Sequence, residues 1–305
     1  MKSVHASSKE SIFGHSAAFI AYAIFGFNII ICKDLTSDGL IPPLGIFTLR
    51  SLVAGSLFWI VSMFQPREQV ERKDYIKIFA ASMLGFLTCQ VTFLVGIPHI
   101  TPMDCSILTA MAPIYTMAVA AIAIKEPITF KKAGGVALSF AGIIYLIVSR
   151  VTAPGGTAES SPFGIFMIIL NSLSFSMYLG IFKPLIAKYS AVTFMKWIFL
   201  FSALVVTPIS LGGLSEVEWA AIPAKQYAEL AYLIICATFI TYFLIPLAQK
   251  RIRPTLISMY SYVQPIIAIA VSIAIGMDVL TWQKALATVL VFSGVVIVSR
   301  SRSAK

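Results

Sequence analysis

Two stretches of this 305-residue chain align without a gap: PMDCSILTAMAPIYTMAVAAIAIKEPITFKKAGGVALSFAGIIYL at 102–146 and PTLISMYSYVQPIIAIAVSIAIGMDVLTWQKALATVLVFSGVVIV at 254–298. The shift between them is a constant 152 residues. The identical pairs include Pro102/Pro254, Ser106/Ser258, Pro113/Pro265, Thr129/Thr281, Lys132/Lys284, Phe140/Phe292 and Gly142/Gly294, and Glu126 aligns with Asp278. Each copy is apolar and has a proline inside an apolar run. The chain therefore contains an internal repeat with the composition of membrane-spanning helices.

The composition of the whole chain is that of a membrane protein. Hydrophobic residues make up 58% of the chain and charged residues only 12%, and the mean hydropathy is +0.90. The net charge of +10 is spread in short clusters between apolar runs, so nucleic-acid binding is excluded as a function. The four cysteines are isolated and form no C-x-x-C pair, which predicts neither a metal site nor a disulfide framework. No cofactor is expected.

Ten apolar runs are long enough to cross the hydrocarbon core as helices. They lie at about 12–32, 43–64, 75–96, 103–124, 130–149, 162–182, 191–211, 227–248, 254–275 and 282–299. The polar, Gly/Pro/Ser-rich segment 151–161 links the first five runs to the last five. We therefore expect two repeats, 12–150 and 162–300, with five spans in each.

The basic residues predict which way the spans are inserted. If the N-terminus lies inside, sixteen basic residues fall in inner segments and four in outer ones, namely Lys33, Arg150, Lys225 and Lys284. Such an excess is typical of the cytoplasmic side. Both chain ends are therefore expected in the cytoplasm, in a multi-pass protein of the cell membrane. Because each repeat has an odd number of spans, the second repeat must enter the membrane upside down relative to the first.

Several stretches carry a resemblance to a known family. They are FGFNIIICKDL at 25–35, PLGIFTLRSLVAGSLF at 43–58, and the two copies that begin at Ser106 and Ser258. Through them the chain resembles the EamA family of the drug/metabolite transporter superfamily over roughly 12–300. The resemblance implies ten transmembrane helices, arranged as two inverted five-helix repeats around a central cavity. It also implies transport of small metabolites, of which amino acids and related compounds, usually moved outward, are the common cargo in bacterial members.

The chain departs from the family pattern at two positions. Family members often have an acidic residue before the proline of the fourth and ninth spans, where this chain has Ala112 and Gln264. The aromatic-glycine pair common in the first span reads Phe25-Gly26. The first departure argues against proton coupling through that position.

The paired prolines mark candidate substrate-binding helices. Pro113 removes the hydrogen bond to the Thr109 carbonyl, and Pro265 does the same to Ser261. Bare carbonyls at membrane depth persist only against protein or a water-filled cavity. Serine and threonine hydroxyls share these helix faces, because Ser106 and Thr109 repeat as Ser258 and Ser261. One interpretation is two kinked helices that offer carbonyls and hydroxyls to a ligand. The other is a packing kink whose hydroxyls bond their own helices.

Arg50 lies well inside the second span. An ionised side chain at that depth costs at least about 2.5 kcal/mol and usually faces the bundle interior or a cavity. It could bind a substrate carboxylate, or it could be a structural arginine bonded to helix-end carbonyls. The remaining candidates are polar or aromatic residues inside spans, which suit a zwitterionic or aromatic solute but also serve as contacts between helices. They are Asn28, Gln90, Tyr178, Tyr242, Tyr260, Tyr262 and Gln264.

Two further patterns concern packing. Glu126 and Asp278 end the fourth and ninth spans, and each is expected to pair with a cation such as Lys131 or Lys284. Small residues (Gly134, Gly135, Gly142 and Gly294) allow the fifth and tenth spans to approach closely, either within one chain or between two, so a monomer and a homodimer both remain open.

The leading hypothesis is a secondary transporter or facilitator that exports amino acids or related small molecules by alternating access. Its partners are then a small-molecule substrate and the lipid bilayer. No nucleotide-binding loop of the GxxxxGKS/T type is present, so ATP is not the expected energy source. One alternative is an exporter of drugs or lipophilic cations, but this chain has no acidic residue in the middle of a span to bind a cation. The other is a non-transport membrane scaffold or an intramembrane enzyme. No catalytic constellation reaches mid-membrane, and we do not expect an enzyme.

Overall fold

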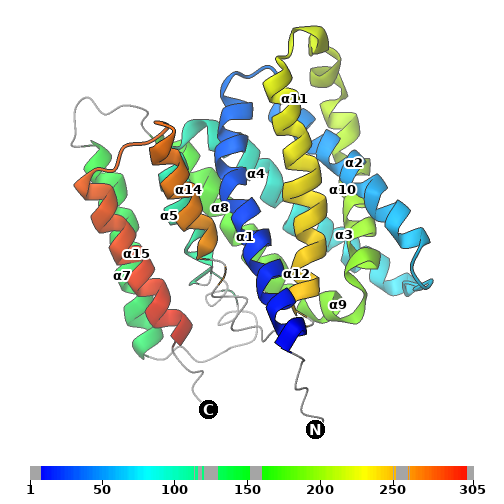
Figure 1. Cartoon of the computed structure of the whole chain (residues 1–305), viewed down its shortest axis with the longest axis horizontal. Helices are drawn as coiled ribbons and strands as arrows, with labels where there is room; N and C mark the ends of the chain where they lie inside the picture. Colours follow the sequence, from blue (N-terminus) through cyan, green and yellow to red (C-terminus); the bar gives the residue numbers. More distant parts are fainter. Residues whose placement is uncertain are drawn as a thin grey trace.

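The computed structural model describes residues 8–112, 114–115, 119, 130–151, 160–249, 251, 260 and 262–300. Within these residues every regular element is a helix. The elements, labelled as in Figure 1, are α1 (Ser8–Ser37), α2 (Pro43–Met63), α3 (Arg72–Ser82), η1 (Met83–Thr88), α4 (Cys89–Gly96), η2 (Ile97–His99), α5 (Pro102–Thr109), α7 (Phe130–Val151), α8 (Pro162–Ile181), α9 (Lys183–Lys188), α10 (Ala191–Ser215), η3 (Trp219–Ala221), α11 (Ala224–Ala231), η4 (Tyr232–Ile240), α12 (Thr241–Gln249), α14 (Val263–Ala274) and α15 (Trp282–Arg300).

Five helical stretches are long and apolar enough to cross a membrane: Ile12–Ser37, Pro43–Met63, Arg72–His99, Ala191–Ser215 and Ala224–Ile245. Shorter apolar helices lie at Ala133–Tyr145, Pro162–Tyr178, Val263–Ala274 and Trp282–Val298. Each stretch coincides with one of the expected spans. The expected span at 103–124 is described mainly in its first part, where it contains α5. The described part of the chain is thus all-helical, with helices typical of a membrane protein.

Helices of the two sequence repeats pack against each other in a reciprocal way. The second spans of the repeats meet as α2 and α10, and the fifth spans meet as α7 and α15. The first helix of repeat one, α1, packs on α12 of repeat two, and the first helix of repeat two, α8, packs on α4 of repeat one. Likewise α1 contacts α14, and α8 contacts α5. Equivalent helices of the two repeats therefore have equivalent partners.

The beginning of α1 and the end of α15 lie at the same end of the bundle (Figure 1). At this end an ionic network joins the start of α3 to α9. Lys188 bonds both Glu71 and Asp74, with 2.6 Å to the latter, and the Tyr189 hydroxyl donates to Asp74 at 2.8 Å. Hydrogen bonds from Lys188, and then from Lys73, hold the pKa of the Glu71 carboxyl below its ordinary value. The network ties repeat one to repeat two at the end that the basic residues predict to be cytoplasmic.

Small residues form a packing seam between α7 and α15, at the far edge of the bundle (Figure 1). A Cβ atom on Gly135 would stand 2.7 Å from the Gly294 carbonyl oxygen. A Cβ atom on Gly142 would stand 3.0 Å from the side chain of Leu290. The Ser139 hydroxyl donates across the seam to the Val291 carbonyl at 3.1 Å. These glycines therefore serve packing within one chain, whereas Gly134 faces open space.

The seam predicts that Gly294→Ala destabilises the protein. Its new methyl group would overlap the Ser139 hydroxyl and the Gly135 carbonyl oxygen, so α7 and α15 must move apart, at a cost of about 1–3 kcal/mol. Thermal unfolding in detergent should show a lower midpoint. The matched control is Gly134→Ala, because nothing lies within 4 Å of its Cβ position and alanine is the better helix former. Equal midpoints for the two variants would refute the seam.

Candidate functional site

The fourth span breaks where the sequence places its proline. Helix α5 ends at Thr109, and the next residues form a tight turn in which the Met111 amide donates to the Leu108 carbonyl at 3.2 Å. The chain is helical again at Ala112. Pro113 itself lies outside the described residues. A helix interrupted at this depth leaves backbone carbonyls without partners from their own helix.

The ninth span has a matching feature. Tyr262 lies in a turn, helix α14 runs from Val263, and Pro265 is buried in the first turn of that helix. Gln264 and Tyr262 are half-buried at the same place, whereas Ser258 and Ser261 lie outside the described residues. A Cβ on Gly26 would stand 2.8 Å from the Gln264 carbonyl oxygen. Glycine therefore lets the backbone of α1 contact the start of α14 directly.

Arg50 sits in α2, about 10 Å along the helix from Pro43 at 1.5 Å per residue, and only 2% of it is exposed. Its Nε–H donates to the Thr238 hydroxyl of η4. Its Nη1–H donates to the Gln90 side-chain oxygen of α4 at 2.5 Å. Among the described residues no carboxylate lies within 4.0 Å of the guanidinium. The Arg50 charge is therefore buried between the two repeats, and its partners among the described residues are neutral.

Two π-helical segments bring the partners of Arg50 together. The segment η1 covers Met83–Thr88 and η4 covers Tyr232–Ile240. A shift of 152 residues moves η1 onto 235–240, so the same part of each repeat is π-helical. The same shift places Gln90 on Tyr242, two residues after each segment, and Tyr242 lies near the guanidinium. Since π-helical turns redirect the side chains around them, and are common at functional sites, equivalent positions of both repeats converge on Arg50.

Other predicted residues line the same region. Asn28 is 8% exposed and its side-chain oxygen accepts from the Cys32 thiol, which lies near Arg50. Tyr178 is buried with its ring packed on Gly85 of η1. Within the described part of the chain, neither Tyr178 nor Tyr242 has a hydrogen-bond partner for its hydroxyl. Two phenols are thus available to a ligand.

Ser106 and Thr109 are placed differently from these residues. The Ser106 hydroxyl is fully buried and donates to the Pro102 carbonyl at 2.6 Å, and the Thr109 hydroxyl donates to the Ser106 carbonyl at 3.1 Å. Both protons are used within α5, as in the packing interpretation of the kink. The structure does not bring these two hydroxyls into the group around Arg50.

Two contacts near the site were missed by the sequence reasoning. Thr238 holds Arg50, and Asn171 donates from Nδ2 to the Cys89 carbonyl at 2.7 Å. Both are polar residues inside apolar runs, which is the signal that identified Gln90. Thr238 also donates to the Leu233 carbonyl, five residues earlier, at 2.8 Å. Its hydroxyl therefore bonds within η4 and still accepts from Arg50.

A second polar group lies where α5 begins. Asp278 forms the expected ion pair with Lys284, and both residues are buried. Its other oxygen accepts from the Met103 amide of α5 at 3.1 Å, so it joins the repeats. Asp104, fully buried, accepts from the Ser160 hydroxyl at 2.5 Å. The corresponding Glu126 lies outside the described residues.

This geometry suits recognition of a small anion. The guanidinium uses two of its five N–H groups, and among the described residues its Nη2 has no acceptor. A carboxylate can bind a guanidinium through two parallel hydrogen bonds. The amide of Gln90 and the phenols of Tyr178 and Tyr242 are further polar groups that a ligand bound at Arg50 could contact.

The chain is similar to a family of transporters along most of its length. The pattern of the EamA-like transporter family matches residues 12–148 and 162–300. An uncharacterized transporter of Archaeoglobus fulgidus is 22% identical over 86% of this chain and 90% of its own length. The uncharacterized transporter YcxC of Bacillus subtilis is 24% identical, over 92% and 90%. A solved crystal structure superposes on 96% of both chains with a TM-score of 0.60 at 15% identity, which shows a shared fold.

Proposed function

Because the chain belongs to the EamA-like transporter family, we propose that this membrane transporter carries amino acids or related carboxylate-bearing solutes, and that Arg50 binds the substrate carboxylate. The observation that carries the proposal is the buried Arg50 guanidinium, which has neutral partners and no carboxylate among the described residues. A buried unpaired charge is costly, and a substrate anion would offset that cost whenever it binds.

The contacts of Arg50 also support a mechanism. Thr238 belongs to repeat two and Gln90 to repeat one, so any rocking of one repeat against the other changes the bonds of the guanidinium. Alternating access around a site between repeats works in this way. The reciprocal packing of the repeats supports an inverted arrangement. Outward transport across the cell membrane, the usual direction that the family resemblance implies, is part of this proposal.

The test is efflux from proteoliposomes loaded with labelled solutes, chosen in matched pairs. Each pair holds an amino acid and the amine that lacks its carboxylate. We expect saturable efflux of at least one amino acid and background efflux of its amine, because only the amino acid can bind Arg50. The opposite result, transport of lipophilic amines and of no amino acid, would favour the drug or cation exporter and overturn the proposal.

A further inference from the structure

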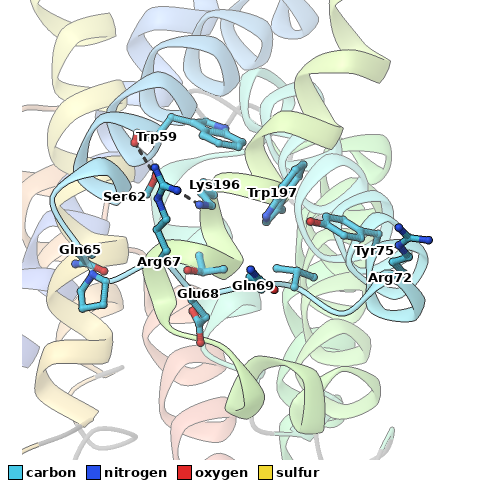
Figure 2. A pocket seen from close by; sticks show the side chains of 13 residues that line it. Trp59, Ser62, Gln65, Arg67, Glu68, Gln69, Arg72, Tyr75, Lys196 and Trp197 are labelled. Carbon is cyan, nitrogen blue, oxygen red and sulfur yellow. Dashed lines mark hydrogen bonds between the residues drawn. The ribbon is translucent and has the colours of Figure 1, made fainter.

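A cavity of about 530 Å³ opens where α2 ends and where α3 and α10 begin (Figure 2). It lies apart from Arg50, at the end of the bundle that holds the first turn of α1 (Figure 1). Its polar lining includes the cations of Arg67, Arg72 and Lys196, and one carboxylate, Glu68. The transport mechanism uses none of these side chains.

The charges of this cavity are unbalanced. The Glu68 carboxylate accepts two hydrogen bonds from Ser190, one from its hydroxyl at 2.6 Å and one from its amide at 3.0 Å. Lys196 lies 4.7 Å from the centre of the Trp59 ring and donates to the Ser62 hydroxyl at 3.5 Å. Figure 2 shows the Arg67 side chain turned toward Ser62 and Lys196. Within the described chain none of the three cations has a carboxylate within 4.0 Å. The lining thus has three cations and one carboxylate. Burial opposes ionisation of that Glu68 carboxyl, but hydrogen bonds from Ser190 and the charge of Lys196 lower its pKa. The net positive charge that remains favours an anion between Arg67 and Lys196.

The remaining lining is aromatic. The Trp59 and Trp197 rings meet edge to face at 5.3 Å, and Tyr75 meets Trp197 at 4.8 Å. Tryptophan and tyrosine gather at the boundary between the hydrocarbon core and the headgroups. Next to the cavity, at the end of α2, Met63 is 80% exposed and Phe64 is 85% exposed. A ligand that fills this place therefore has an anionic head and apolar chains.

We propose that this cavity binds the phosphate of an anionic phospholipid, held between Arg67 and Lys196, with its acyl chains along Met63 and Phe64. Basic pockets between helices on the cytoplasmic side suit such headgroups. The aromatic residues place this cavity at the membrane interface, so the phosphate of a lipid would lie at the same depth as Arg67 and Lys196. Bound lipid would brace the junction of α2 with α3 and α10, where the repeats meet.

Native mass spectrometry of the detergent-solubilised protein, titrated with phosphatidylglycerol or phosphatidylcholine, tests this inference. Phosphatidylglycerol should bind the wild type at least tenfold more tightly. Arg67→Gln should weaken it about fivefold and Arg67→Gln with Lys196→Gln about 30-fold, since each basic side chain near an anionic lipid contributes about 1 kcal/mol. Arg67 is exposed, so the single variant keeps the fold.

The matched control is Lys73→Gln, which removes a cation from the same end of the protein but outside this cavity, where Lys73 pairs with Glu71. It should change lipid affinity by less than about twofold, as expected of an exposed pair. Equal binding of the two lipids, an equal loss in Lys73→Gln, or complete displacement of the lipid by inorganic phosphate would each overturn the proposal. The assay measures no transport, so its outcome is independent of the proposed substrate.

Discussion

Arg50→Ala should reduce the transport efficiency of amino-acid efflux (maximal rate divided by KM) at least about 100-fold. Removing one partner of a buried, hydrogen-bonded charge pair costs about 2–5 kcal/mol, and the substrate carboxylate would lose its only guanidinium. Arg50→Lys should retain part of the activity, about tenfold below the wild type, because an ammonium keeps the charge but not the two-pronged geometry. The measurement is the initial rate of efflux from proteoliposomes as a function of internal substrate concentration.

Three controls separate binding from folding in this experiment. Each variant should elute as one symmetric gel-filtration peak and bind phosphatidylglycerol as the wild type does, since the lipid cavity lies elsewhere. Gln90→Ala removes one bond that orients the guanidinium and should cost less than Arg50→Ala. Lys73→Gln removes an exposed cation and should leave efflux unchanged. An Arg50→Ala protein that transports at the wild-type rate would rule out Arg50 as the substrate anchor.

Asp278→Asn should lower the free energy of unfolding by about 3–5 kcal/mol, because it leaves the buried Lys284 ammonium without its partner. The asparagine can still accept a hydrogen bond from the Met103 amide, so the loss of stability would come from the missing negative charge. The measurement is denaturation in detergent, followed by tryptophan fluorescence.

The double variant Asp278→Asn with Lys284→Met provides the comparison. It removes both charges, so it should recover most of the stability that Asp278→Asn loses. The single variant Lys284→Met completes the set. If the losses of the two single variants simply added in the double variant, the pair would be solvated rather than buried, contrary to the 7% exposure of Asp278 and the 5% exposure of Lys284.

Much of this arrangement is predictable from the amino-acid sequence. The repeat with its 152-residue shift predicts equivalent helices, and the prolines at 113 and 265 predict where they break. The turn at 110–111 agrees with a break in the fourth span, whereas most residues that precede Pro265 in the ninth span lie outside the described residues. The burial of Arg50 follows from its place in an apolar run. The Asp278–Lys284 pair is confirmed because a buried acid needs the nearest cation.

Other parts required coordinates. The π-helical form of η1 and η4 has no signal in helical periodicity, since the same apolar residues suit an α-helix. From the sequence alone, Thr238 would therefore be interpreted as a threonine whose hydroxyl bonds only within its own helix. Likewise the glycines of the fifth and tenth spans suit an interface within one chain or between two. The direction in which each helix faces its neighbours decides this, and the structure places Gly135 against Gly294.

The account rests on two halves inserted in opposite directions around Arg50, and cysteine accessibility in intact cells tests this directly. On a background with the four native cysteines replaced by serine, single cysteines would be placed at Leu40, after the first span of repeat one, and at Ala187, after the first span of repeat two; both are exposed. A membrane-impermeant maleimide added outside should label Leu40→Cys and spare Ala187→Cys until the membrane is opened. Labelling of both positions from the same side would contradict the inverted arrangement.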